Sequence, residues 1–214
     1  MLKLPSLLIF ITTFSFAQPK LGIWRGVLLL NSEKQIELPF NFEIKNIKGK
    51  RQLIIHNAQE QIVVDELKFK KDSFNFKMPI FDTEFKTKLI GDSILIGVWI
   101  NHTKKENKTI DFTATAGDSR RFPFVPGKPN TFYEGKWEVS FSPGTADSSK
   151  AIGMFTHSNG SAYVYGTFLT ETGDYRYLDG MMHNGKLYLS CFDGSHAFLF
   201  IAENNGNEIT KGDF

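Results

Sequence analysis

The only cysteine of the chain, Cys191, lies five residues before His196. A thiol beside an imidazole can be converted to a thiolate, the nucleophilic form of cysteine. If Asp193 and Gly194 are the central residues of a tight hairpin, Cys191 and His196 oppose each other at about 5 Å. One interpretation is an activated thiolate, and the other is a pair buried in the core. The surrounding leucines and phenylalanines favour the core pair, in which a thiol is inert.

A second group of candidates follows a turn expected at Thr172–Gly173, where aromatic and charged residues alternate. The group consists of Asp174, Tyr175, Arg176 and Tyr177. Such a strand lines a ligand groove or a domain interface, or it is an exposed edge whose Asp and Arg side chains pair. We favour the interface. Asp193 joins these four residues as a candidate for ligand or interface contacts.

Other motifs do not complete a catalytic site. Gly194-Ser195-His196 lacks the flanking pattern of a serine-hydrolase nucleophile. The histidines show no zinc-like spacing, so we expect neither a metal nor a cofactor. A single cysteine excludes an intramolecular disulfide and a Cys-X-X-Cys redox site within these residues. Whether the chain is an enzyme therefore stays open.

Two neighbouring arginines are candidates for an anion-binding site. Arg120 and Arg121 lie beside Phe122 and Phe124, in a stretch rich in proline and glycine. Arginine binds carboxylates and phosphates, so an anion site is one possibility. A solvated linker is the other, and we favour it because most exposed charges are simply hydrated.

The N-terminus predicts export. Lys3 precedes an uncharged, mostly apolar stretch from Leu4 to Phe16, and Ser15-Phe16-Ala17 has small residues where signal peptidase reads them. We therefore expect residues 1–17 to be a signal peptide that is cleaved before Gln18. The mature chain is expected in the periplasm or outside the cell, without a membrane span. Because 25 basic residues nearly balance 23 acidic ones, nucleic acid is not an expected partner.

Hydrophobic alternation predicts an all-β fold. Leu38, Phe40, Phe42 and Ile44 alternate with polar residues, and the same period of two recurs at Phe74–Met78 and Trp137–Phe141. Dipeptides that favour tight turns separate such runs, so successive strands should pair antiparallel. They are Asn159-Gly160, Asn184-Gly185, Asp193-Gly194 and Asn205-Gly206.

A sparse internal repeat divides the chain into two similar β-meander or barrel-like units in tandem. Gly22-Ile23-Trp24 opens the first, and Gly135-Lys136-Trp137 follows 113 residues later. We expect the first unit over residues 18–116, a linker over 117–130 and the second unit over 131–214. The strand that corresponds to that of Trp99 stops at Phe214, so we expect the second unit to be truncated.

The stretch from Gly166 to Ala202, with the Gly-X-Trp openings Gly22–Gly26 and Gly135–Val139, resembles the N-terminal region of exported TlpA-like thiol–disulfide proteins of Bacteroidetes-type bacteria. In that family a β-rich region precedes a thioredoxin-like domain with the Cys-X-X-Cys site. The resemblance implies a periplasmic location and a redox-linked parent protein. No redox residue carries over.

Two functions follow as hypotheses. The first is a non-catalytic β module that positions a thioredoxin-like domain or its redox client protein. The second is a free-standing exported protein that holds a small apolar or carbohydrate ligand inside a barrel, which rests on analogy between folds.

Overall fold

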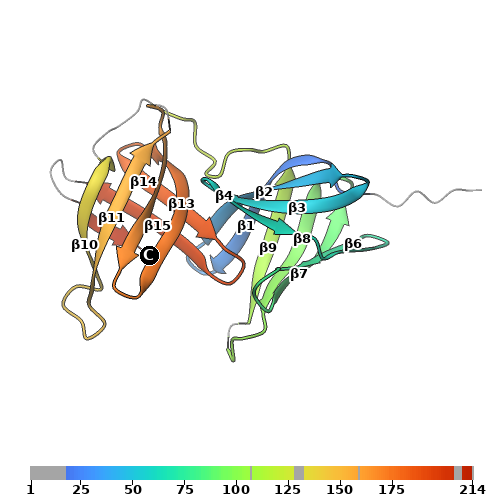
Figure 1. Cartoon of the computed structure of the whole chain (residues 1–214), viewed down its shortest axis with the longest axis horizontal. Helices are drawn as coiled ribbons and strands as arrows, with labels where there is room; N and C mark the ends of the chain where they lie inside the picture. Colours follow the sequence, from blue (N-terminus) through green and yellow to red (C-terminus); the bar gives the residue numbers. More distant parts are fainter. Residues whose placement is uncertain (1–17, 107, 128–132, 159, 205–208, 214) are drawn as a thin grey trace, which may run out of the picture.

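The computed structural model describes residues 18–106, 108–127, 133–158, 160–204 and 209–213. Sixteen strands occupy this part of the chain and form two antiparallel sheets, one after the other in sequence (Figure 1). The all-β, two-unit architecture expected from the alternation is therefore confirmed. The expected signal peptide, Asn159 and the Asn205-Gly206 turn lie outside the described residues. Within the described part, no helix is long and apolar enough to cross a membrane.

The first sheet is nearly closed into a barrel. Its order is β4-β3-β2-β1-β9-β8-β7-β6-β5, so β1 pairs with both β2 and β9 while β3 approaches β5 across the gap. The strands are β1 (Gly22–Asn31), β2 (Ile36–Ile47), β3 (Lys50–Asn57), β4 (Glu60–Val64), β5 (Leu67–Lys70), β6 (Ser73–Lys77), β7 (Thr83–Ile90), β8 (Ile94–Asn101) and β9 (Thr109–Ala116).

The alternating residues of β2 explain how this barrel is filled. Leu38, Phe40, Phe42 and Ile44 all point inward and are fully buried. Side chains two apart lie on the same face of a strand, so one strand delivers four apolar groups to the interior. Trp24 and Trp99 are fully buried in the same cluster, so the barrel interior is a packed aromatic core.

The second sheet is a curled half-barrel with the sequential order β10 to β16. Its strands are β10 (Gly135–Phe141), β11 (Ser149–His157), β12 (Tyr163–Thr170), β13 (Gly173–His183), β14 (Lys186–Phe192), β15 (Ala197–Asn204) and β16 (Ile209–Asp213). Asn184 and Gly185 have positive φ angles of 49° and 77° between β13 and β14, as the Asn-Gly turn predicts.

The two Gly-X-Trp openings have the same local structure. Gly22 and Gly135 have φ angles of 109° and 101°, a backbone conformation that residues other than glycine rarely adopt. The indole Nε1 of Trp24 donates to the carbonyl of Lys20 at 2.9 Å, and that of Trp137 donates to Tyr133 at 3.0 Å. Each tryptophan therefore fixes the entry of its unit in the same way, which supports the internal repeat.

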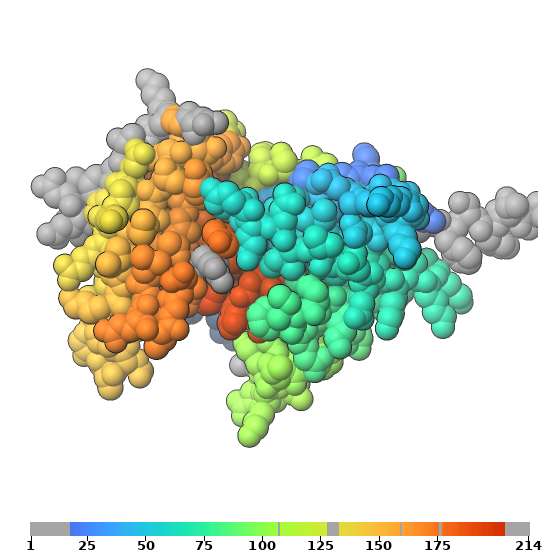
Figure 2. All heavy atoms as spheres, viewed as in Figure 1, coloured from blue at the N-terminus to red at the C-terminus, as the bar shows by residue number. Residues whose placement is uncertain are grey.

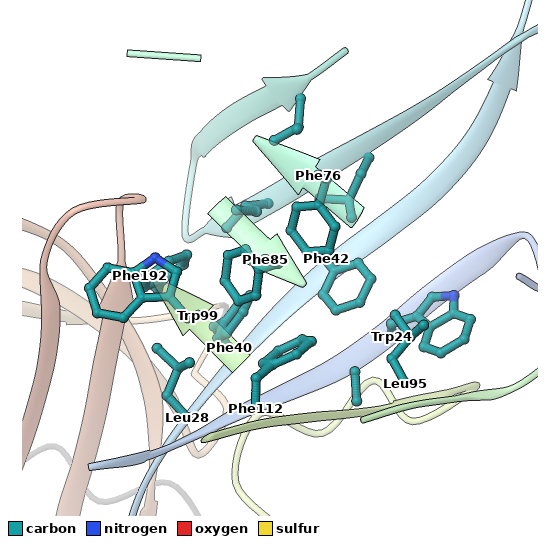
Figure 3. Close-up of a cluster of buried hydrophobic side chains, with 14 of the residues drawn as sticks. Trp24, Leu28, Phe40, Phe42, Phe76, Phe85, Leu95, Trp99, Phe112 and Phe192 are labelled. Carbon is teal, nitrogen blue, oxygen red and sulfur yellow. The ribbon is translucent and has the colours of Figure 1, made fainter. Parts of the chain in front are cut away.

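One phenylalanine of the second unit belongs to the core of the first. Phe192, at the end of β14, lies with its ring centroid 4.7 Å from that of Phe40 and 5.6 Å from those of Phe85 and Trp99 (Figure 3). Its neighbour Cys191 points the other way, into the core of the second unit. Successive residues of β14 therefore serve two cores, and the units share one continuous packed joint.

Hydrogen bonds around Phe192 fix the joint. The Nδ2 of Asn57 donates to the Phe192 carbonyl at 2.9 Å, and the Phe192 amide donates to Oδ1 of Asn57 at 3.3 Å. The hydroxyl of Ser190 donates to the carbonyl of Pro39 at 2.5 Å, and that of Thr83 donates to the carbonyl of Gly194. The buried side chains of Asn57, Ser190 and Thr83 are thus each paired across the two units.

The segment between the sheets contradicts the favoured interpretation of a solvated linker at one of its two arginines. Arg121 is only 5% exposed, and its guanidinium contacts the carbonyls of His56 and Ser190 and the carboxylate of Asp179. Arg120 is exposed and pairs with Asp118. Phe122 and Phe124 pack on Tyr188. These two rings hold the segment against the second sheet, which carries Arg121 into the joint.

Candidate functional site: the inter-unit cleft

A cleft of about 420 Å³ lies where the two units meet, beside the joint, and we name it the inter-unit cleft. Figure 2 shows this hollow between the orange strands of the second unit and the green segment of the first. The first unit contributes Glu60, Ile62 and the β6–β7 loop, Pro79 to Phe81. The second contributes the β12–β13 turn, Asp174, Tyr175 and the β14–β15 loop.

The β14–β15 loop differs from the tight turn expected at Asp193-Gly194. Phe192 pairs with Ala197 and Cys191 with Phe198, so four residues, 193–196, form the loop. Oδ1 of Asp193 accepts hydrogen bonds from the amides of Ser195 and His196, at 2.8 and 2.7 Å. An aspartate that accepts bonds from the next residues stabilises a wider loop than a two-residue turn. The expected opposition of Cys191 and His196 is therefore wrong.

The thiol of Cys191 is buried in the core of the second unit, as the core interpretation predicts for this residue. Burial raises its pKa to about 12, outweighing the opposing effect of the Arg121 charge. At neutral pH the thiol is therefore protonated and a poor nucleophile. The activated-thiolate interpretation has no geometric support.

We expect Cys191 in the native protein to react with a thiol reagent such as DTNB far more slowly than in urea, where the thiol is exposed. The expected native rate follows the rate of unfolding, because a thiol with a pKa near 12 supplies almost no thiolate at pH 8. Stopped-flow absorbance measures both rates. Rapid labelling of the folded chain would contradict this account.

His196 instead pairs with Asp193 in the wall of the cleft. Its Nδ1 lies 2.9 Å from Oδ2 of Asp193, and the side chain is 56% exposed. The ring stacks on Phe198 at 5.5 Å and meets the edge of Phe81 at 6.0 Å. A carboxylate that holds one ring nitrogen leaves the other to face a ligand. The pair is an oriented hydrogen-bonding group in the wall of the cleft, whereas Cys191 is buried in the core of the second unit.

The cleft combines apolar surface with negative charge. Among the described residues that line it, Glu60, Asp174 and Asp193 are acidic, and His196 is the one basic side chain. Ile80 is 81% exposed, which is unusual for a large aliphatic residue in a loop. Such a surface favours a ligand that carries both positive charge and an apolar group.

A further pocket lies beside the cleft, and we name it the outer pocket. It measures about 460 Å³ and is lined by Asp174 and Tyr177, together with Met154, Tyr165 and Thr167 of the second sheet. Asp174 lines both cavities. The structure thus brings Asp174, Tyr175, Tyr177, Asp193 and His196 to one region. Arg176 lies in β13, but its side chain is outside the described part, and Cys191 is buried elsewhere.

The chain matches no family model, no curated protein and no solved structure. Within the described residues, no group of three or more His, Cys, Asp and Glu side chains is arranged to hold a metal ion.

Sequence reasoning did not find the residues of the first unit that line the cleft, chiefly Glu60, Ile80 and Phe81. The sequence did contain a signal for them, because Ile80 and Phe81 are two large apolar residues that follow Pro79 in a segment between strands. Loops with exposed apolar residues often mark binding surfaces.

Proposed function

We propose that this chain is the non-catalytic β module of an exported, TlpA-like thiol–disulfide system, and that its inter-unit cleft holds a polypeptide segment of the redox partner. The observation that carries the proposal is the cleft itself: its walls come from both units, and Phe192 fixes the two units to each other. A rigid cleft between two domains is a common place for a binding site.

The chemistry of the thiol supports a non-catalytic role. Thiol–disulfide exchange requires an accessible thiolate, whereas Cys191 is buried with a raised pKa. The redox step would then belong to the thioredoxin-like domain or its client, and this module would position one against the other.

The alternative, a small ligand held inside a barrel, has less support in the first unit. Five of the buried phenylalanines drawn in Figure 3 fill its interior: Phe40, Phe42, Phe85, Phe112 and Phe192. Ligand-binding barrels keep an open cavity at this place.

Titration of the chain with the reduced thioredoxin-like domain of a TlpA-like exported protein tests the proposal. We expect saturable binding by isothermal titration calorimetry, and at least a tenfold weaker affinity for Ile80→Lys, because this change removes an apolar contact and places a positive charge against a positively charged segment.

Val125→Lys is the matched control, since Val125 is also a highly exposed aliphatic residue, at 75%, but does not line the cleft. It should bind like the unaltered chain. Absence of saturable binding, or equal loss in both variants, would refute the proposed function.

A further inference from the structure

The outer pocket is built around a bulge between β12 and β13. Gly166 pairs with Leu178 and Phe168 with Tyr175, so Thr167 alone lies opposite Arg176 and Tyr177. On its other side Thr167 pairs with Met154 of β11. A bulge re-aims side chains and is frequent beside binding sites.

Thr167 is one of the residues that line this pocket, and its hydroxyl oxygen is buried and has no hydrogen-bond partner. A buried hydroxyl without a partner costs free energy comparable to a lost hydrogen bond. A hydroxyl both donates and accepts, so it matches either kind of polar group on a ligand.

The rest of the lining is mainly apolar and comes from both units. Met154, Phe155, Tyr165 and Tyr177 of the second unit surround the bulge, and the β3–β4 turn of the first, at Ala58, closes one side. The amide of Ala58 donates to Oδ2 of Asp179 at 3.3 Å, which holds the turn in place. The volume falls within the range of small-molecule sites, about 300–1,000 Å³.

We propose that the outer pocket binds a small, neutral, largely apolar molecule with one hydrogen-bonding group, and that this group bonds the Thr167 hydroxyl. The lining also includes the polar side chains of Gln59, Lys136, Thr156 and Asp174, but apolar surface predominates. Among the described residues of the lining, Thr167 alone carries a buried polar atom without a partner. Such a pocket favours a largely apolar molecule over a carbohydrate, most of whose hydroxyls would lose their water without replacement. This inference does not depend on the polypeptide proposed for the inter-unit cleft.

Two fluorescent probes of nearly the same shape test it. N-Phenyl-1-naphthylamine carries one N–H group, and 1-benzylnaphthalene has a methylene in its place. We expect the amine to bind the full chain with saturable fluorescence enhancement. Thr167→Val keeps the side-chain shape, so it should weaken the amine about 3- to 10-fold and leave the hydrocarbon unchanged or slightly tighter.

Thr113→Val, an exposed threonine of β9, is the control and should alter neither probe. Met154→Trp fills the pocket from a partly exposed position and should weaken both probes at least tenfold. The proposal is overturned if the amine does not bind saturably, if Thr167→Val affects both probes alike, or if Met154→Trp, still folded by circular dichroism, binds both as tightly as before.

Discussion

Phe192→Ala should lower the free energy of unfolding of the whole chain by about 3–5 kcal/mol, the usual cost of removing a large aromatic ring from a packed core. The loss should affect the first unit, although the residue belongs to the second, because its ring packs on Phe40, Phe85 and Trp99. Urea unfolding followed by tryptophan fluorescence measures it, since Trp99 lies in contact with the missing ring.

The same experiment tests whether the units unfold together. A shared core should give the unaltered chain a single transition, and Phe192→Ala should separate it into two. Phe69→Ala is the control, because Phe69 is 45% exposed at the rim of the first sheet and should cost about 1 kcal/mol or less. A loss below that of Phe69→Ala would show that Phe192 does not join the units.

Arg121→Met should destabilise the protein by about 2–4 kcal/mol, because it leaves several buried acceptors without their donor. The guanidinium serves Ser190, the carbonyl of His56 and Asp179, which lie in both units. Methionine keeps most of the apolar stem, so the loss reports the hydrogen bonds and charge. Thermal and urea unfolding measure the change.

The neighbouring Arg120→Met is a matched control in the same segment. Arg120 is exposed and pairs only with the nearby Asp118 among the described contacts, so no measurable loss of stability is expected. Equal effects of the two substitutions would mean that the segment acts as a hydrated connection and that Arg121 does not fasten the joint.

Strands were predictable because their signal is local. The alternation at Leu38–Ile44 is visible in seven residues, and a strand with one buried face follows from it directly. The length of the Asp193-Gly194 turn was not predictable in this way, because it depends on a side chain. The carboxylate of Asp193 accepts hydrogen bonds from two backbone amides and so stabilises a wider loop. Turn dipeptides give the place of a turn more surely than its length.

The joint was beyond the reach of local patterns. Ser190 bonds Pro39 across a separation of 151 residues, and no periodicity reports such a pair. The sequence of β14 contains one hint. Phe192 lies on the face opposite Cys191 and Leu189. If only one face of the sheet were buried, the other would face solvent and a polar residue would be expected at position 192. Because local patterns do not report contacts between the units, the sequence indicated the site residues of the second unit but not the residues of the first unit that face them, such as Ile80.

The position of Phe192 also has a consequence for the chain while it is being synthesised. A ribosome makes chains from the N-terminus at about 5–20 residues per second, so all nine strands of the first sheet exist several seconds before Phe192 does. During that interval Phe40, Phe85 and Trp99 lack a ring that covers them in the finished protein. The nascent first unit thus offers an apolar surface to chaperones, and chains that stop short of β14 keep it open to proteases. Synthesis of β14 is therefore the step that covers this aromatic cluster.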